Sequence, residues 1–382
     1  MIGLRGIPAT YGGIEAAVEG LSVELVRRGH SVTVYGRSAY CDPELSEYRG
    51  IRLRRLPQIN TKHLEAASHT LFASAVALTK GKHDVLHIHA TGPAVFSVVA
   101  RLTRTACVAT VQGLDWEREK WGPLASRVLR VGAYAAVTVP HETIVVSRAL
   151  QQTLRERYPC DPVYIPNGVD ECATDRSDPV ADLESGNFIL FLGRLVPEKE
   201  IHTLIDAYRR LDSATPLVIA GPGSHSSEYV THLHRLAAGD SRIRLIGPRY
   251  GDEKNWLLQN ASVFVQPSNL EGLPVALLEA ISCGCFTIVS DIPENTEVVT
   301  RGGHRHGLVF RTGDARDLAS QLANALANPR RDQEADECRR DVLSEYAWPR
   351  LAEQTERVYQ RALSRVNGRG VAAPNGGSPA RP

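Results

Sequence analysis

The sequence is poor in lysine and has no long apolar run. Only six of its 44 basic residues are lysines, so each lysine is notable. No stretch approaches the roughly 20 apolar residues that a membrane-spanning helix needs. The first residues also lack the charged, apolar and cleavage segments of a secretory signal. We therefore expect a cytoplasmic protein, soluble or bound at the inner face of a membrane.

Large excess charge and paired cysteines are also absent. A formal net charge of +1 gives no field to hold nucleic acid, so we expect no nucleic-acid partner. The seven cysteines are scattered, without the paired spacing of a zinc site. Cys283 and Cys285 follow an apolar helix pattern and precede a strand pattern, where small buried cysteines are ordinary. These features predict free thiols in a reducing cytosol.

Short β-branched runs alternate with amphipathic helix patterns along the whole chain, which predicts an α/β protein with parallel sheets. The length of 382 residues exceeds what one hydrophobic core usually fills, so two domains are expected. Met1 lies almost inside the first expected strand, which favours a natural start slightly upstream. The expected strands are residues 2–4, 32–35, 51–53, 85–88, 108–111, 143–146 and 163–165, then 188–192, 217–220, 243–246, 263–265, 287–289 and 308–310.

Breaks in this pattern indicate the domain boundaries. The Asn167-Gly168 turn ends the first domain (1–168), and polar residues 169–186 form a linker. The second domain spans 187–346. A closing helix covers about 347–366, and residues 367–382, rich in Gly, Pro, Ala and Ser, are predicted to be disordered.

Two regions carry residues suited to phosphate. Gly12 and Gly13 end the segment between the first strand and the first helix, where backbone N–H groups favour an anion. In the second half, Gly193-Arg194-Leu-Val-Pro-Glu-Lys199 follows a strand and places two basic side chains at its end. Parallel sheets bind ligands at these strand ends.

A second segment, from Asn269 to Glu279, adds two carboxylates. Pro274 suits the first turn of a helix, so the Gly272 and Leu273 amides would lie at its positive end. Glu271 precedes the helix and Glu279 lies five residues inside it, on the order of 10 Å away. A sugar nucleotide fits this spacing: hexose at one carboxylate, diphosphate at the amides, ribose at the other.

Taken together, these motifs resemble glycosyltransferase family 4, from about residue 2 to 365. The likeness rests on Glu271-x7-Glu279, the segment 193–199, Pro166-Asn-Gly-Val-Asp170 and Tyr346-Ala-Trp348. The stretch Arg5-Gly-Ile-Pro-Ala-Thr-Tyr-Gly-Gly-Ile-Glu15 resembles a bacterial rhamnosyltransferase-like branch. The resemblance implies a retaining enzyme with the GT-B fold, in which two Rossmann-like domains face each other and the last helix crosses back to the first domain.

The resemblance also implies roles for individual residues. Arg194 and Lys199 would hold the donor diphosphate, with Gly193 beside them and Gly13 backing it from the first domain. Glu279 would bind the ribose, and Glu271 the sugar hydroxyls, a binding role that we favour over that of a covalent nucleophile. The sequence has no Asp-x-Asp, so we expect no metal and no other cofactor besides the nucleotide-sugar co-substrate.

Two residues depart from the family pattern. Glu200 replaces the usual glycine, and its charge would be unfavourable beside a diphosphate unless it points to solvent. Gln112 replaces a histidine and cannot carry a proton. Gln112, Asp115 and His89 are candidate sugar or acceptor contacts. His87 and His89 share one face of a strand like a metal pair, but with no third ligand we favour a structural or acceptor-side role.

The predicted function is therefore a hexosyl- or deoxyhexosyltransferase for polysaccharide biosynthesis, with a cell-envelope glycan or lipid-linked acceptor. The basic-apolar stretch from Arg127 to Val131 suits peripheral membrane contact. Two alternatives stay open: a GT-B sugar-nucleotide epimerase and a non-catalytic sugar-nucleotide-binding protein. A dinucleotide oxidoreductase is disfavoured, because Gly221-Pro-Gly223 lacks the third glycine of its fingerprint.

Overall fold

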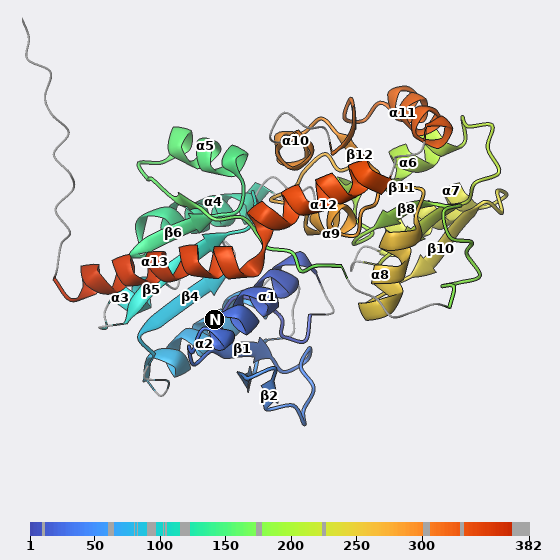
Figure 1. The fold of residues 1–382 in the computed structure, drawn as a ribbon. Coiled ribbons are helices and arrows are strands. Elements are labelled where there is room, and N and C mark those ends of the chain that lie inside the picture. Colours follow the sequence, from blue (N-terminus) through green and yellow to red (C-terminus); the bar gives the residue numbers. More distant parts are fainter. Residues whose placement is uncertain are drawn as a thin grey trace, which may run out of the picture.

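In the computed structural model, two α/β units share the chain, the first in blue to green and the second in yellow to orange (Figure 1). The structure describes residues 1–9, 12–59, 65–79, 81, 83–89, 97–101, 103, 105–114, 123–172, 178–223, 227–300, 306–328 and 332–368. Most of the predicted tail, residues 369–382, lies outside these ranges. Both units contain parallel sheets, which confirms the predicted α/β fold.

The first domain contains one sheet of three strands and one of four. The strand orders are β1-β3-β2 and β4-β5-β6-β7, and only β2 runs antiparallel to its neighbour. The strands are β1 (Thr33–Arg37), β2 (Glu47–Tyr48), β3 (Ile51–Leu56), β4 (Val85–His89), β5 (Ala106–Val111), β6 (Glu142–Val145) and β7 (Val163–Tyr164).

The strand predicted at residues 2–4 is reduced to a single bridge, between Ile2 and Ile88. Gly3 has φ +100°, and a Cβ there would lie 2.1 Å from the carbonyl oxygen of His89, so the chain bends where only glycine fits. The segment still joins the two sheets. The Ile2 N–H donates to His87, and the Tyr35 N–H donates to the carbonyl of Met1.

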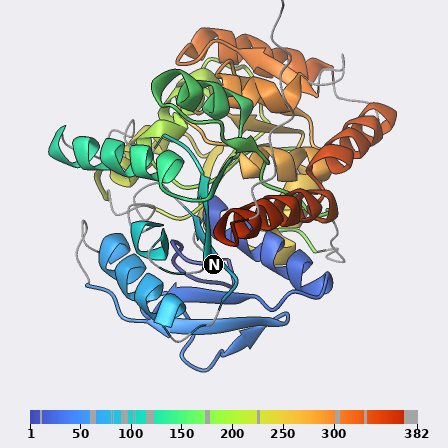
Figure 2. The same ribbon diagram turned by 90° about the vertical axis from the view of Figure 1, so that its left-hand side faces the viewer.

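The helices that pack on these sheets in the described part of the first domain are α1 (Gly13–Arg27), α2 (Glu65–Thr79), α3 (Ser97–Arg101), α4 (Pro123–Thr138) and α5 (Arg148–Arg157), and the last helix of the chain joins them. In α1, Val18, Leu21 and Leu25 recur at helical spacing and are buried, as the pattern predicts. Their face packs against the last helix, α13 (Trp348–Val366). Figure 2 shows the two helices side by side.

The second domain has one parallel sheet of six strands in the order β10-β9-β8-β11-β12-β13. Its strands are β8 (Ile189–Leu192), β9 (Leu217–Ala220), β10 (Ile243–Gly247), β11 (Val263–Gln266), β12 (Thr287–Ser290) and β13 (Gly307–Phe310). The chain winds outward in both directions from β8 and β11. The C-terminal ends of β8 and β11 therefore mark the topological switch point, where such sheets bind ligands.

The helices of this domain follow the strands in turn. They are the 3-10 helix η3 (Pro197–Lys199), α6 (Ile201–Tyr208), α7 (Ser227–Ala237), α8 (Gly251–Asn260), α9 (Val275–Ser282), α10 (Pro293–Val299), α11 (Ala315–Ala327) and α12 (Asp332–Tyr346). None of the helices in the described ranges is long and apolar enough to cross a membrane.

The chain passes twice between the domains, and the two crossings are adjacent. The Val169 N–H donates to the carbonyl of Tyr346 over 2.9 Å, and Val169 forms a bridge with Ala347. Ala347 is extended between α12, which packs on α9, and α13, which packs on β5 and β6. The closing helix thus returns to the first domain, as the GT-B prediction requires (Figure 1).

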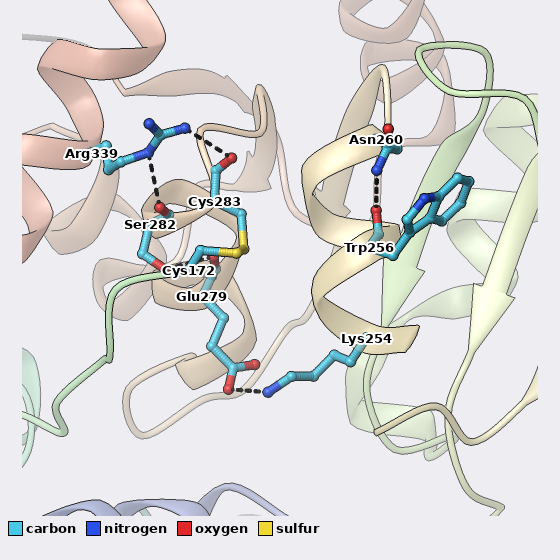
Figure 3. Close-up of a disulfide and its surroundings, with 8 residues drawn as sticks. All are labelled: Cys172, Lys254, Trp256, Asn260, Glu279, Ser282, Cys283 and Arg339. Carbon is cyan, nitrogen blue, oxygen red and sulfur yellow. Dashed lines mark hydrogen bonds and ion pairs between the residues drawn. A yellow bond between two sulfur atoms is a disulfide. The ribbon is translucent and has the colours of Figure 1, made fainter. Parts of the chain in front are cut away.

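The free-thiol prediction is wrong for Cys283, because the structure pairs it with Cys172 in a disulfide (Figure 3). The partners are 111 residues apart, so no local spacing could reveal them. Cys172 follows the first domain crossing, and Cys283 caps the C-terminal end of α9. Arg339 of α12 donates to the carbonyls of Ser282 and Cys283. The disulfide therefore ties the interdomain linker to α9.

Candidate functional site

The loops after β8 and β11 meet at the switch point through an ion pair. Lys199 Nζ lies 2.5 Å from Glu271 Oε1, and their side chains are 16% and 9% exposed. Burial acts to raise the pKa of the Glu271 carboxyl, but the Lys199 ammonium and nearby hydrogen bonds outweigh it, so the net pKa is lowered. Glu271 is therefore ionised at neutral pH in spite of its burial.

A buried polar network holds Glu271, and no local motif predicts it. The Gln266 amide donates to Glu271 Oε1 and, over 2.9 Å, to Ser268 Oγ. Asn295 Nδ2 donates to Ser290 Oγ over 2.8 Å, and Ser290 Oγ donates to the Ser268 carbonyl. These contacts restrict the direction of the carboxylate, because hydrogen bonds are strong in a buried, low-dielectric environment.

A second lysine–glutamate pair joins α8 to α9. Lys254 Nζ of α8 lies 2.7 Å from Glu279 Oε1 of α9 (Figure 3). Their side chains are 26% and 22% exposed, so both can reach a ligand. Lys254 lies in none of the sequence motifs, and the scarcity of lysine is the signal that could have identified it. Each carboxylate of the Glu-x7-Glu motif thus has its own lysine.

The N-terminal end of α9 faces that of α1 across the domains. Pro274 is the N-cap of α9 instead of lying in its first turn as predicted, so Gly272 and Leu273 precede the helix. A Cβ on Gly13, the first residue of α1, would lie 3.5 Å from Val275 Cγ2. Two positive helix ends therefore converge beside the two ion pairs.

Glutamates of α1 shape the glycine-containing loop that precedes it. Glu15 Oε1 accepts the Arg5 N–H over 3.1 Å, and Glu19 Oε2 accepts the Ala9 N–H over 2.7 Å. Gly12 is the N-cap, in an extended conformation. Both glutamates therefore pin the loop to the first two turns of the helix.

The loop after β8 is held by a glycine contact with the neighbouring strand. The Gly193 N–H donates to the Ala220 carbonyl over 3.0 Å. A Cβ on Gly221 would lie 1.8 Å from the Gly193 carbonyl oxygen, so this second turn must be glycine. Arg194, half-buried, follows in the same loop. The Gly221-Pro-Gly223 turn, which resembled part of a dinucleotide fingerprint, thus packs against the predicted phosphate loop.

The two domains also touch directly at Gly272. A Cβ there would lie 1.8 Å from the Gln112 carbonyl oxygen, and one on Gly113 would lie 3.4 Å from Gly272 Cα. The Gln112 side chain accepts a hydrogen bond from Asn167 over 3.0 Å. The loop after β5 therefore abuts the segment that carries Glu271.

Next to this contact lies a partly open cavity of about 30 Å³, lined by His87, His89, Thr110, Gln112 and Asn167, among others. His87 contacts the hydroxyls of Tyr359 and Thr110 at 2.8 and 2.7 Å. Both ring nitrogens of His89 are buried and have no hydrogen-bond partner among the described residues. Burial lowers the pKa of His89 to about 3, so this histidine is neutral.

Across the described residues, no group of three His, Cys, Asp or Glu side chains could hold a metal ion. Of the remaining predicted contacts, Asp115 lies outside the described residues. The other predicted residues lie in the loops after β5, β8 and β11, at the N-terminal end of α1 and in α9, around the region between the two domains that we call the cleft. His89 ends β4 and lines the cavity.

Known proteins resemble both halves of the chain. The profile described as Glycosyltransferase Family 4 matches residues 11–171, and the profile described as Glycosyl transferases group 1 matches residues 175–342. The chain is a GT-B glycosyltransferase. This confirms the enzyme class that the motifs predicted.

Similar proteins cover nearly the whole glycosyltransferase. The α-maltose-1-phosphate synthase of Mycobacterium tuberculosis is 26% identical over 94% of this chain and 97% of its own. The structure of a sucrose-phosphate synthase from Thermosynechococcus elongatus aligns with TM-score 0.79 and 20% identity over 94% of this chain and 96% of that one. Anabaena HepE in complex with UDP-glucose aligns with TM-score 0.73 and 19% identity, covering 94% and 98%.

Proposed function

We propose that this glycosyltransferase is a retaining, metal-independent enzyme of the rhamnosyltransferase-like branch. It would move a hexosyl or deoxyhexosyl group from a nucleoside-diphosphate donor to a cell-envelope, polysaccharide or lipid-linked acceptor. The observation that carries the proposal is the pair of lysine–glutamate contacts flanking the N-terminal end of α9 at the switch point. Similar proteins support the donor class, since HepE is described in complex with UDP-glucose.

The charges of the cleft suit a diphosphate. An ammonium has three N–H donors, and Glu271 takes one from Lys199, which leaves two for phosphate oxygens. Arg194 and the converging ends of α1 and α9 would add further positive partners. Because these groups would neutralise the developing charge on the leaving diphosphate, the reaction would need no cation.

The carboxylates suit hydroxyl groups. Glu271, held by Lys199 and Gln266, has acceptor capacity left for the hydroxyls of the transferred sugar. Glu279, with one oxygen on Lys254, would accept from the ribose. The Glu271 carboxylate is already engaged by cationic and amide donors, which weakens it as a nucleophile. We therefore give it a binding role.

Among the described residues of the acceptor side, the predicted contacts His89 and Gln112 are weak bases. His89 is neutral with a pKa of about 3, and Gln112 has no proton to exchange at neutral pH. We therefore assign deprotonation of the acceptor hydroxyl to the leaving phosphate. The phosphate oxygen released from the anomeric carbon would take this proton on the face of the sugar from which the nucleoside diphosphate departs. The acceptor oxygen would then bond to the anomeric carbon from the same face, so the anomeric configuration would be retained.

One surface supports a membrane-associated acceptor. On α4, Val131 and Tyr134 are 65% and 52% exposed, and Arg130 beside them is exposed too. Apolar and basic side chains together suit the surface of anionic lipid. The side chains of residues 127–129 lie outside the described set. Sedimentation with anionic vesicles at low salt tests this contact, and absence of binding would remove it.

A panel of nucleotide sugars tests the proposed donor. A ligand present at about 100 times its Kd should stabilise the protein by about 2.7 kcal/mol, which raises the melting temperature. Incubation of the stabilising donor with glycan or lipid-linked acceptors, in EDTA, then separates the alternatives. Transfer to an acceptor supports the proposal. An altered sugar nucleotide without transfer would indicate an epimerase, and binding without turnover a non-catalytic protein.

A further inference from the structure

Glu200, which departs from the family pattern, has an unusual backbone conformation. It caps both η3 and α6 with φ 52° and ψ 34°, in the left-handed region. A glycine adopts this conformation without steric cost, whereas a residue with a Cβ is strained there. Retention of a strained residue beside a functional site calls for a compensating role.

The Glu200 side chain does not point to solvent, and is only 15% exposed. Its Oε1 accepts from Asn269 Nδ2 over 2.8 Å, and its Oε2 accepts from Thr203 Oγ1 over 2.6 Å. The ring of His202 lies 3.3 Å from Oε2. The carboxylate is thus held by polar partners that a glycine could not engage.

These contacts join the two loops that form the proposed donor site. Glu200 directly follows Lys199, and Asn269 lies two residues before Glu271. A second contact, from the Asn269 N–H to the Glu198 carbonyl at 3.1 Å, runs parallel to the first. The two segments that carry the Lys199–Glu271 pair are therefore also joined by two hydrogen bonds from Asn269.

We infer that Glu200 is a positioning residue, whose carboxylate fixes Lys199 relative to Glu271 by holding Asn269. The inference rests on the proposed donor site. This role explains why a negative charge is tolerated near a diphosphate. The Glu200 carboxylate accepts hydrogen bonds from Asn269 and Thr203, which stabilise its charge. An enzyme with glycine at this position would have an unstrained backbone there, but it would lack the side-chain contact that joins the two loops.

The decisive variant is Glu200→Gly, because relief of backbone strain and loss of the Asn269 contact should change stability and activity in opposite directions. Relief of the left-handed strain should leave the melting temperature unchanged or higher. Loss of the brace should lower kcat by about tenfold, with a smaller change in the donor KM. Glu200→Gln, which keeps an acceptor for Asn269, should retain most of the activity. In the double variant Glu200→Gly/Asn269→Ala, no further loss is expected.

Asp182→Gly is the matched control, because Asp182 is an exposed acidic residue with φ 54° in the predicted linker and belongs to none of the site motifs. It should relax a similar strain without any effect on kcat. Wild-type kcat in Glu200→Gly would overturn the inference. So would a parallel loss of melting temperature and activity, since that would mark a merely structural residue.

A measurement without substrate separates this inference from the proposed function. The pKa of the Glu271 carboxyl, followed by NMR titration and assigned with Glu271→Gln, should rise in Glu200→Gly, because Lys199 is held less closely. An unchanged pKa would refute the brace. If the wild type binds and turns over no nucleotide sugar, the proposed function fails, while this titration still decides the role of Glu200.

Discussion

Replacement of Lys199 by methionine would leave the Glu271 carboxylate buried without its ammonium partner. The two side chains are 16% and 9% exposed, so water can replace the lost contact only in part. Breaking a buried ion pair from one side typically costs about 3–5 kcal/mol of unfolding free energy. Because Gln266 and Ser268 still hydrogen-bond to the carboxylate, we expect the lower part of this scale, about 3–4 kcal/mol at pH 7.

The pH dependence of this loss has a definite sign. In the wild type the folded pKa of Glu271 is depressed, so its stabilisation is present above the unfolded pKa and is lost as pH falls through the folded pKa. Without Lys199, burial dominates and the folded pKa should lie above the unfolded value. The variant's carboxyl then takes a proton at a higher pH, so its deficit against wild type should shrink between pH 7 and pH 4.5.

Chemical denaturation at both pH values measures the effect. The double variant Lys199→Met/Glu271→Gln should recover most of the stability at pH 7, because no charge is then buried, but should not recover activity. Arg357→Met breaks an exposed pair with Glu353 and should cost no more than about 0.5 kcal/mol. An equal deficit at both pH values, or a double variant as unstable as the single one, would refute the reasoning.

Three further predictions concern other parts of the cleft. Lys254→Met should raise the donor KM by roughly tenfold with little change in kcat, because Glu279 loses the group that orients it; steady-state kinetics with an unchanged KM would disprove this. Gly272→Ala should lower turnover by about a hundredfold while circular dichroism stays native, since the new Cβ forces the domains apart; normal turnover would show that the observed closure is not needed. Reduction of the Cys172–Cys283 disulfide by dithiothreitol should cost about 2–4 kcal/mol of unfolding free energy and lower the melting temperature by several degrees. It should leave the melting temperature of the matched control, Cys172→Ser, unchanged.

The architecture could be predicted from the sequence, because parallel strands that are buried on both faces form continuous apolar runs. Phe188 to Leu192 and Leu217 to Ala220 are such runs, and each contains a strand of the sheet. The strand predicted at residues 2–4 was wrong, because the sequence does not reveal that Gly3 has a positive φ, which interrupts the strand pairing.

Site residues were predictable only where a local motif carried them. Glu271 and Glu279 lie in one motif, but their partners Lys199 and Lys254 are 72 and 25 residues away, and such contacts depend on the tertiary fold. The disulfide of Cys172 was missed for the same reason. The strain at Glu200 is also invisible in a sequence, although the departure from the family pattern was a signal.

The most direct test of the account is a calorimetric titration of the stabilising nucleotide sugar into wild type, Glu279→Gln and Glu271→Gln, in EDTA, with turnover measured in parallel. Lost hydrogen bonds to an ionised group predict about tenfold weaker donor binding in Glu279→Gln. Glu271→Gln should lower turnover as well as affinity. If both variants bind and turn over the donor as the wild type does, nucleotide-sugar chemistry does not take place at this cleft.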